Sequence, residues 1–459
     1  MQNGINPSLL VTDLYELAML QAYFDCDMEA QAVFEFFVRE LPPDHGYLVA
    51  LGQGLVLDYL QQARFSEQEL SWLQASGHFS PAFLDSLAAF RFRGEVRAMP
   101  EGTPFFANEP ILRVTAPLPQ AQLVETRIIN LLQYSILAGT KASRCVQAAP
   151  DHLMVDFGLR RAHGAEAGLL AARASYIAGF EGSSNVAAAA QFGIRPYGTM
   201  AHSFIQAHDS ELQAFANFAH AQPDNVVLLI DTYDTELAAR KLGQLARRLR
   251  QDNITIRAVR LDSGDLNTHA HKVRQLLDQQ GLTEVKIFAS GGLDEYQVAA
   301  LMQAGAPIDG FGIGSRLTVS AGAPYLDCAY KLVEYGAAPR CKLSEQKATL
   351  PGPKQVYRRY DDSGRAVSDT VATAAETGMA GEPLLRPIMA EGQALQVAPG
   401  LDELRDYHRA QMQTLRPALR SIAAAADYPV SISDSLQRLH QETETEVARR
   451  AREELMSLD

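Results

Sequence analysis

A single histidine, His202, lies in the stretch GTMAHSF (residues 198–204), among small or uncharged neighbours. A histidine in this setting can be structural, or it can act as a metal ligand, as a general acid–base, or as a nucleophile that forms a covalent intermediate. Metal ligation has the weakest support, because the stretch holds no partner at ligand spacing and no HxxxH pair occurs in the chain. The stretch alone leaves the other three roles open.

The motif RLDSGD places Arg260 and Asp262 two residues apart. On an extended strand, residues at this spacing share one face. An arginine there can hold a phosphate or a carboxylate through two parallel hydrogen bonds, and an aspartate can orient ribose hydroxyls or a metal-bound water. The alternative is an internal Arg–Asp ion pair without a ligand.

The motif FGLRRAHG combines an aromatic ring, Phe157, with two guanidinium groups, Arg160 and Arg161. The ring can stack on a flat ligand while an arginine meets an anionic group. A core phenylalanine followed by two surface arginines is an equally good explanation of this motif alone.

Two glycine-containing motifs, ASGGLDE and FGIGSR, predict a phosphate site. Glycines let backbone amides approach phosphate oxygens, and in α/β barrels such sites form after consecutive strands. The residues concerned are Ser290, Gly291 and Gly292 in the first motif and Gly314 and Ser315 in the second. Tight turns without a ligand are the alternative, but two such motifs after consecutive strands favour phosphate.

These motifs follow short apolar runs that alternate with helical segments, which predicts a parallel sheet. The runs lack period-two alternation, as expected for strands covered on both faces. Fewer than eight strand–helix units are present, so we expect an irregular α/β barrel with reactive groups at the carboxyl ends of its strands. The runs are HLMVDFGLR, IRPYGTMAHS, NVVLLIDTYDT, IRAVRLDSGDL, VKIFASGGLDE and IDGFGIGSR, and their ends also carry Asp156, Asp231, Asp234, Asp265 and Gly312.

The chain is expected to divide into three segments. Residues 1–140 mix helix and strand, residues 141–335 form the barrel with the active site, and residues 336–459 pack with the N-terminal domain. The last segment ends in a charged helix, SLQRLHQETETEVARRAREELMSLD, whose ionic residues most simply form a solvated face.

Composition limits the class of protein. The 459 residues carry a net charge of −13, which argues against nucleic-acid binding. The widely spaced cysteines, Cys26, Cys145, Cys328 and Cys341, form no CxxC pair and are expected to be reduced thiols of a cytoplasmic protein. The acidic N-terminal stretch does not read as a signal peptide, and no uncharged apolar run is long enough to span a bilayer.

Taken together, the motifs resemble those of the nicotinate phosphoribosyltransferases. The resemblance runs in family order from residue 9 to about 358, roughly three-quarters of the chain. It is carried by LLVTDLYELAM, FEFFVRELP, ETRIINLLQYSILAGTKASR, DFGLRRAHG, GSSNV, GTMAHSF, RLDSGDL, ASGGLDE, FGIGSRL, YKLVEY and KLSEQKATLPGPKQVYR.

The resemblance implies transfer of the ribosyl group of 5-phosphoribosyl 1-pyrophosphate to nicotinate. The products are nicotinate mononucleotide, the first intermediate of NAD synthesis from nicotinate, and pyrophosphate. ATP hydrolysis is coupled through transient phosphorylation of a histidine that matches His202, and Mg²⁺ is the expected cofactor. The implied fold is the irregular barrel of the type II phosphoribosyltransferases, with a smaller α/β domain built from both chain ends and an active site at a homodimer interface.

The same resemblance assigns roles to individual residues. Tyr15 matches a tyrosine that reaches the nicotinate site from the neighbouring subunit, and Phe157 matches the ring-stacking aromatic. The matches near the substrates are Arg160, Thr199, Arg260 and Asp262, and those of the 5-phosphate cradle are Gly291, Gly292, Gly314 and Ser315, with Ser290 beside them. Lys342 and Lys347, in the basic loop KLSEQK, are further candidates for contacts with pyrophosphate or ATP.

Three other functions remain as alternatives. A nicotinamide-specific enzyme needs a carboxylate near the neutral base, where this chain has GSSNV (residues 182–186). A quinolinate-specific enzyme needs extra cations for a second carboxylate and no phosphorylated histidine. A non-enzymatic metabolite-binding protein is the least favoured, because the reactive His, Arg, Asp and Gly positions are all present.

Overall fold

A computed structural model describes residues 5–343, 349–422 and 426–457. The chain forms two compact units. One is Ala138–Pro324, and the other consists of the described residues of Gln2–Leu137 and Tyr325–Asp459. The unit built from both chain ends is the larger one, whereas the sequence led us to expect a smaller domain there.

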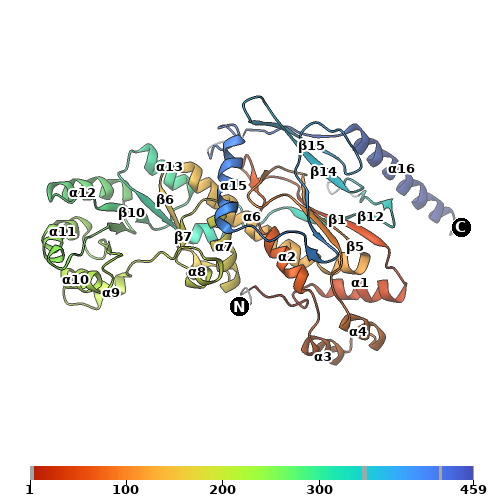
Figure 1. The fold of residues 1–459 in the computed structure, drawn as a ribbon, viewed down its shortest axis with the longest axis horizontal. Helices are drawn as coiled ribbons and strands as arrows, with labels where there is room; N and C mark the ends of the chain where they lie inside the picture. Colours follow the sequence, from red (N-terminus) through yellow and green to blue (C-terminus); the bar gives the residue numbers. More distant parts are fainter. Residues whose placement is uncertain (1–4, 344–348, 423–425, 458–459) are drawn as a thin grey trace. The chain divides into compact units, whose positions relative to one another are not determined.

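The unit Ala138–Pro324 is built on a six-stranded sheet in which every pairing is parallel (Figure 1). Its strand order is β7-β6-β11-β10-β9-β8, so β7 and β8 form the two edges of an open sheet. The strands are β6 (Leu153–Asp156), β7 (Gly182–Ser183), β8 (Val227–Leu229), β9 (Ala258–Leu261), β10 (Lys286–Ser290) and β11 (Gly310–Ile313). The α/β class and the irregular barrel-like sheet predicted from the sequence are confirmed.

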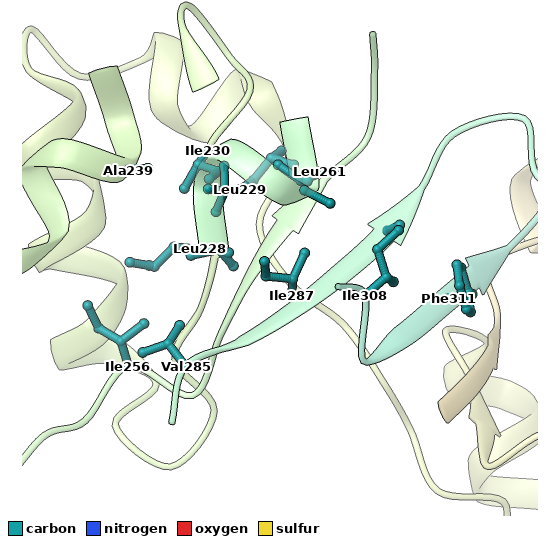
Figure 2. Packing of buried hydrophobic residues seen from close by; sticks show 14 of the residues in the cluster. Leu228, Leu229, Ile230, Ala239, Ile256, Leu261, Val285, Ile287, Ile308 and Phe311 are labelled. Atoms are coloured by element: carbon teal, nitrogen blue, oxygen red, sulfur yellow. The ribbon is translucent and has the colours of Figure 1, made fainter. Parts of the chain in front are cut away.

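Helices follow the strands of this unit in sequence. They are α7 (Ala165–Ile177), α8 (Val186–Phe192), α9 (His202–Gln206), α10 (Glu211–Ala221), α11 (Thr235–Leu249), α12 (Leu266–Gln279), α13 (Glu295–Gln303) and α14 (Ser315–Thr318), with 3₁₀ turns at Leu159–Arg161 and Arg250–Asp252. One side of α11 and α12 is apolar and joins the core of the sheet. Figure 2 shows part of this core, with Leu228, Leu261 and Ile287 on the adjacent strands β8, β9 and β10.

One predicted strand is absent. The run IRPYGTMAHS was expected to form a strand, but its only strand-like feature in the described structure is an isolated bridge between Pro196 and Ser183. Pro196 has no N–H to donate to a ladder, and Gly198 carries no side chain to pack against a sheet. The segment therefore lies beside the edge strand β7 as a loop, where the Ser183 N–H donates to the Arg195 carbonyl at 3.2 Å and the Tyr197 N–H donates to the Ser183 carbonyl at 3.0 Å, and it ends at the start of α9.

The larger unit contains a seven-stranded sheet of order β13-β12-β1-β5-β3-β17-β18, which interleaves strands from both ends of the chain. A four-stranded sheet, β16-β14-β15-β19, and the pair β2-β4 complete its strands. The bounds are β1 (Gln31–Val38), β2 (Leu48–Val49), β3 (Glu95–Ala98), β4 (Pro104–Phe105), β5 (Pro110–Pro117), β12 (Cys328–Tyr335), β13 (Ala338–Pro339), β14 (Lys354–Tyr360), β15 (Ala366–Thr373), β16 (Glu382–Pro383), β17 (Arg386–Ala390), β18 (Gln393–Ala394) and β19 (Val430–Ile432).

The helices of this unit are α1 (Leu14–Asp25), α2 (Gln53–Gln62), α3 (Glu67–Ser76), α4 (Pro81–Ala88), α5 (Leu118–Leu123), α15 (Leu401–Thr414) and α16 (Asp434–Met456). The boundary between the two units falls within the long helix α6 (Glu125–Ala148). Among the described residues, none of these helices is long and apolar enough to cross a membrane.

Candidate active site

Arg260, Ser290 and Asp262 form one hydrogen-bonded group at the carboxyl ends of β9 and β10. Arg260 donates from Nε to the Ser290 hydroxyl at 2.8 Å and from a terminal nitrogen to Asp262 Oδ1 at 2.6 Å. Ser290 in turn donates to the same Asp262 oxygen at 2.5 Å. Arg260 also donates to the Thr199 hydroxyl at 3.1 Å. The guanidinium is therefore held in one plane by three different side chains.

Asp262 is also tied to the end of β8. Its backbone N–H donates to Asp231 Oδ2 at 3.0 Å, and the Ser263 hydroxyl donates to the same oxygen at 2.5 Å. Burial of the Asp262 carboxyl opposes its ionisation, but the Ser290 hydrogen bond and the Arg260 charge outweigh burial and hold the pKa of Asp262 below its usual value. Asp262 is therefore an anion at neutral pH.

His202 is the first residue of α9, and its ring lies near residues that follow β8 and β9. Its Nδ1 lies 3.1 Å from the Thr232 hydroxyl, and its Nε2 lies 3.8 Å from Asp262 Oδ2. The side chain is 40% exposed, so the ring is accessible from solvent. When Nδ1 carries the ring hydrogen and donates to Thr232, the lone pair lies on Nε2, which is the arrangement of a nucleophilic imidazole.

Phe157 follows β6 and stands beside this group. The guanidinium carbon of Arg260 lies 5.3 Å from the centroid of its ring, within cation–π range, and the Phe288 ring lies 5.7 Å away. A Cβ added at Gly312 would lie 2.6 Å from Phe157 Cδ2, so the ring rests directly on that glycine. Phe157, Tyr197, Thr199 and Phe288 also line one part of a cavity of about 460 Å³, but its other lining residues include Val227, Ala258 and Lys286, the first residues of β8, β9 and β10, so this cavity extends toward the end of the sheet opposite Arg260 and Asp262.

Asp156 fixes the loop that carries Phe157. Its carboxylate is fully buried and accepts hydrogen bonds from the Gly158 N–H at 2.7 Å and from the Ser183 hydroxyl at 2.6 Å. Burial raises the pKa of Asp156 to about 6, against the lowering effect of these two donors. This carboxylate therefore joins the Phe157 loop to the segment at Gly182–Ser183.

Two of the predicted phosphate-binding glycines, Gly291 and Gly314, lie in tight backbone contacts. Gly291 has φ +101°, and a Cβ there would lie 2.0 Å from the Asp262 carbonyl oxygen. A Cβ at Gly314 would lie 2.9 Å from the Phe157 carbonyl oxygen. Gly292 has φ +67° and open space around it, and Ser315 is exposed at the start of α14. These two turns therefore require glycine, and each lies against a loop that carries another candidate residue.

No contact in the described part of the chain joins the remaining candidate residues to this group. Arg160 and Arg161 are exposed in a 3₁₀ turn. Asp234 and Asp265 accept hydrogen bonds from backbone N–H groups at the starts of α11 and α12, so they act as helix caps. Tyr15, which is 48% exposed in α1, and Lys342 belong to the other unit, and Lys347 lies outside the described residues.

Three residues of this site were not predicted from the sequence. Thr232 faces His202, Ser183 binds Asp156, and Phe288 lies beside Phe157. Thr232 directly follows Asp231 in the run NVVLLIDTYDT, so its position at a strand end was the available signal. Nothing in the local pattern of Ser183 or Phe288 distinguishes them from ordinary core residues.

Two carboxylates of the site suit a magnesium ion. Asp231 Oδ1 is buried and has no hydrogen-bond partner within the described part of the chain, and Asp262 lies next to it through the backbone contact. Mg²⁺ prefers such oxygen ligands and usually takes one or two carboxylates together with substrate phosphates. Among the described residues, no cluster of three or more His, Cys, Asp or Glu side chains could hold a metal without substrate.

Comparison with known proteins covers both units. Family models described as the nicotinate phosphoribosyltransferase N-terminal domain, the nicotinate phosphoribosyltransferase family and the nicotinate phosphoribosyltransferase C-terminal domain match residues 10–133, 152–338 and 377–440.

Individual relatives agree with these models. The chain is 48% identical to a nicotinate phosphoribosyltransferase of Mycobacterium tuberculosis, over 93% of this chain and 92% of the relative. It is 34% identical to the Bacillus subtilis nicotinate phosphoribosyltransferase, over 97% of each chain. The crystal structure of human nicotinic acid phosphoribosyltransferase is similar, with a TM-score of 0.83, 29% identity and coverage of 94% of this chain and 99% of that one. The chain therefore belongs to the nicotinate phosphoribosyltransferase family of enzymes.

Proposed function

We propose that this chain is an ATP-coupled nicotinate phosphoribosyltransferase that catalyses the first step of NAD synthesis from nicotinate. The reaction joins the nicotinate ring nitrogen to C1 of the ribose of 5-phosphoribosyl 1-pyrophosphate and releases pyrophosphate. The observation that carries the proposal is the group Phe157, Arg260, Asp262 and His202 at the carboxyl ends of adjacent strands, in a chain of this family. A cytoplasmic location remains a prediction.

The base is expected to bind against Phe157. Its aromatic ring stacks on the Phe157 face, and its carboxylate meets the positive field of Arg260, whose guanidinium is fixed by Ser290 and Asp262. Nicotinate's ring nitrogen is already unprotonated near neutral pH, so the attack needs no general base. The chain's contribution to this step is to hold the base and the ribose in line.

Departure of pyrophosphate places negative charge on the leaving group as the bond from C1 to its oxygen breaks. The transition state has oxocarbenium character, and we propose that the anionic Asp262 faces the positive charge that develops on the ribose. Asp231 and Asp262 would hold the magnesium ion, which neutralises the phosphate charges when bound. Gly291, Gly292, Gly314 and Ser315 offer backbone and hydroxyl groups to the 5-phosphate.

His202 is proposed to accept the terminal phosphoryl group of ATP. Its Nε2 forms the N–P bond while the bond from the phosphorus to the ADP oxygen breaks, and later water takes the phosphoryl group to give inorganic phosphate. The Thr232 contact at Nδ1 supports Nε2 as the attacking atom. The resulting dianion beside Asp262 changes the charge of the site and can favour the state that binds the phosphoribosyl substrate productively.

The homodimer remains part of the proposal. Tyr15 lies in the first turn of α1 with its side chain 48% exposed, which suits a ring that completes the base site of a second subunit. Burial of the hydroxyl and its contact with Glu16 raise the pKa of Tyr15, so it is neutral at physiological pH.

Nicotinamide as the substrate has less support. The segment GSSNV carries no acidic residue, and the Asp156 carboxylate that binds Ser183 is buried and already accepts hydrogen bonds from Gly158 and Ser183. A neutral amide would therefore find no acidic acceptor within GSSNV. Quinolinate as the substrate would leave His202 without a role. If product formation did not depend on ATP, quinolinate would again be a candidate substrate.

The test is a product assay with nicotinate and 5-phosphoribosyl 1-pyrophosphate, with and without ATP, repeated with nicotinamide and with quinolinate as base. We expect nicotinate mononucleotide, more of it with ATP, and at least about 100-fold lower kcat/KM with nicotinamide. Absence of nicotinate mononucleotide under both conditions would contradict the proposal.

A further inference from the structure

Arg316 and Asp294 form an ion pair that no candidate role so far explains. Arg316 follows Ser315 in α14, and Asp294 stands two residues after Gly292. A guanidinium nitrogen of Arg316 lies 2.8 Å from Asp294 Oδ2. An ion pair thus joins the segments that follow the two glycine turns of the site.

The Asp294 carboxylate is buried and held in place by further hydrogen bonds. It is 2% exposed, and its second oxygen, Oδ1, accepts hydrogen bonds from the backbone N–H groups of Tyr296 at 3.0 Å and Gln297 at 3.3 Å. The carboxylate therefore caps α13 with one oxygen and holds Arg316 with the other. A movement of α14 away from the Gly291–Gly292 turn would pull Arg316 away from Asp294.

A second cation, Lys141 of α6, bridges the same two elements. Its Nζ lies 2.7 Å from Glu295 Oε2, at the start of α13, and donates to the Ala321 carbonyl at 2.7 Å. The Ala321 N–H donates to the Arg316 carbonyl at 2.9 Å, so Ala321 belongs to the turn that ends α14. Lys141 is 3% exposed, and this bridge is therefore shielded from solvent.

We propose that Arg316 and Asp294, supported by Lys141, act as positioning residues for the 5-phosphate of the phosphoribosyl substrate. The pair fixes the separation between the Gly291–Gly292 turn and the Gly314–Ser315 turn. Phosphate binding by backbone groups depends on that separation, because the donors cannot adjust as a flexible side chain can. This inference rests on the proposed function, since it assigns the two turns to a phosphate.

The pair has a matched control in the same unit. Lys241 and Glu211 form an ion pair at 2.7 Å, with side-chain exposures of 44% and 4%. The corresponding values for Arg316 and Asp294 are 45% and 3%. Both pairs join an exposed cation to a buried carboxylate, but Lys241 and Glu211 belong to α11 and α10, neither of which directly follows a glycine turn of the site. General destabilisation should therefore affect both pairs alike, whereas a phosphate-positioning effect should follow only Arg316 and Asp294.

The experiment uses the full chain and the variants Arg316→Gln, Asp294→Asn, the double variant, Arg316→Lys and Lys241→Gln. Asparagine keeps the helix-capping oxygen of Asp294 while it removes the charge. Three quantities are measured for each protein: KM for 5-phosphoribosyl 1-pyrophosphate, KM for nicotinate, and Kd for ribose 5-phosphate by calorimetry, which does not require turnover.

We expect Arg316→Gln and Asp294→Asn each to raise the KM for 5-phosphoribosyl 1-pyrophosphate and the Kd for ribose 5-phosphate by about tenfold or more. KM for nicotinate should stay within about twofold, the double variant should be no worse than either single variant, and Arg316→Lys should recover most of the affinity.

If both single variants bind ribose 5-phosphate as tightly as the wild type does, the positioning role is overturned. Turnover by the wild-type chain would show in that case that the proposed function still holds. Equal losses in Arg316→Gln and Lys241→Gln would overturn the positioning role as well, because they indicate general destabilisation. A wild-type chain with neither turnover nor ribose 5-phosphate binding would contradict the proposed function and the positioning role together.

Discussion

The Nε2 atom of His202 lies 3.8 Å from Oδ2 of Asp262. This separation is too long for a hydrogen bond but short enough for a direct electrostatic interaction. Because Asp262 is held as an anion by Ser290 and Arg260, it opposes a second anion beside it. A phosphoryl group on Nε2 would therefore introduce a repulsion between these two residues that the neutral imidazole does not have.

Thr232 is predicted to set the reactive tautomer of His202. In Thr232→Val the hydroxyl that faces Nδ1 is lost, so the ring hydrogen is no longer held on that nitrogen. We expect about tenfold slower phosphorylation by ATP, measured as acid-labile label against time. Thr232→Ser should keep most of the rate. Thr268→Val, which alters an exposed hydroxyl in α12, serves as the control, and an equal loss in that variant would contradict the role of Thr232.

Ser290 is predicted to govern the ionisation of Asp262. In Ser290→Ala, Asp262 loses its strongest stabilising hydrogen bond and Arg260 loses one of its anchors. The pKa of Asp262 should rise, so the acidic limb of the kcat/KM profile should move to higher pH, with kcat/KM about tenfold or more lower at pH 7. Ser175→Ala, at another buried serine of the same unit, is the control. An unmoved acidic limb would show that Asp262 does not depend on Ser290.

Gly312→Ala is predicted to disturb the base site. The added methyl group would lie 2.6 Å from Phe157 Cδ2, so the ring must move away from its present position. We expect KM for nicotinate to rise by about tenfold, with a smaller change in KM for 5-phosphoribosyl 1-pyrophosphate. Gly400→Ala places its methyl in open space and should leave both constants unchanged. A selective rise in the phosphoribosyl KM would assign Phe157 to the other substrate.

Asp156 is predicted to make stability depend on pH. Its pKa of about 6 lies above its ordinary value near 4, so between these values the folded chain binds more protons than the unfolded chain. The contribution of Asp156 to stability is therefore greatest at low pH and falls as pH rises.

Asp156→Asn removes this titration while keeping the size of the side chain. Between pH 5 and pH 7, the free energy of unfolding of the wild type should fall by about 1 kcal/mol relative to the variant, measured by denaturant titration. A constant difference between the two proteins would mean that Asp156 is ionised throughout this range.

Much of the barrel unit could be predicted from sequence, because its strands are continuous apolar runs that end in polar or glycine residues. Those ends carry Arg260, Asp262 and Ser290, which the structure joins by hydrogen bonds. The prediction of a strand just before His202 was wrong, because the apolar content of that run does not show that Pro196 and Gly198 keep it out of the sheet. Asp234 and Asp265 stood at strand ends like the others, yet their side chains cap the next helices.

The larger unit was harder to predict, because its sheet pairs strands far apart in the chain. β1 lies between β5 and β12, so its partners come from both ends of the sequence. Local pattern cannot specify such pairings. The contacts of Thr232, Ser183, Asp294 and Arg316 depend in the same way on which strand ends and helix starts become neighbours, and no spacing in the sequence encodes them.

The phosphorylation of His202 is tested most directly by incubating the full chain with γ-labelled ATP and measuring acid-labile label on the protein. His202→Ala is compared with His208→Ala, a neighbouring histidine whose Nδ1 faces the Phe204 carbonyl. We predict label on the wild type and on His208→Ala, none on His202→Ala, and loss of ATP stimulation of product formation only in His202→Ala. Acid-labile label that persists on His202→Ala would contradict the account.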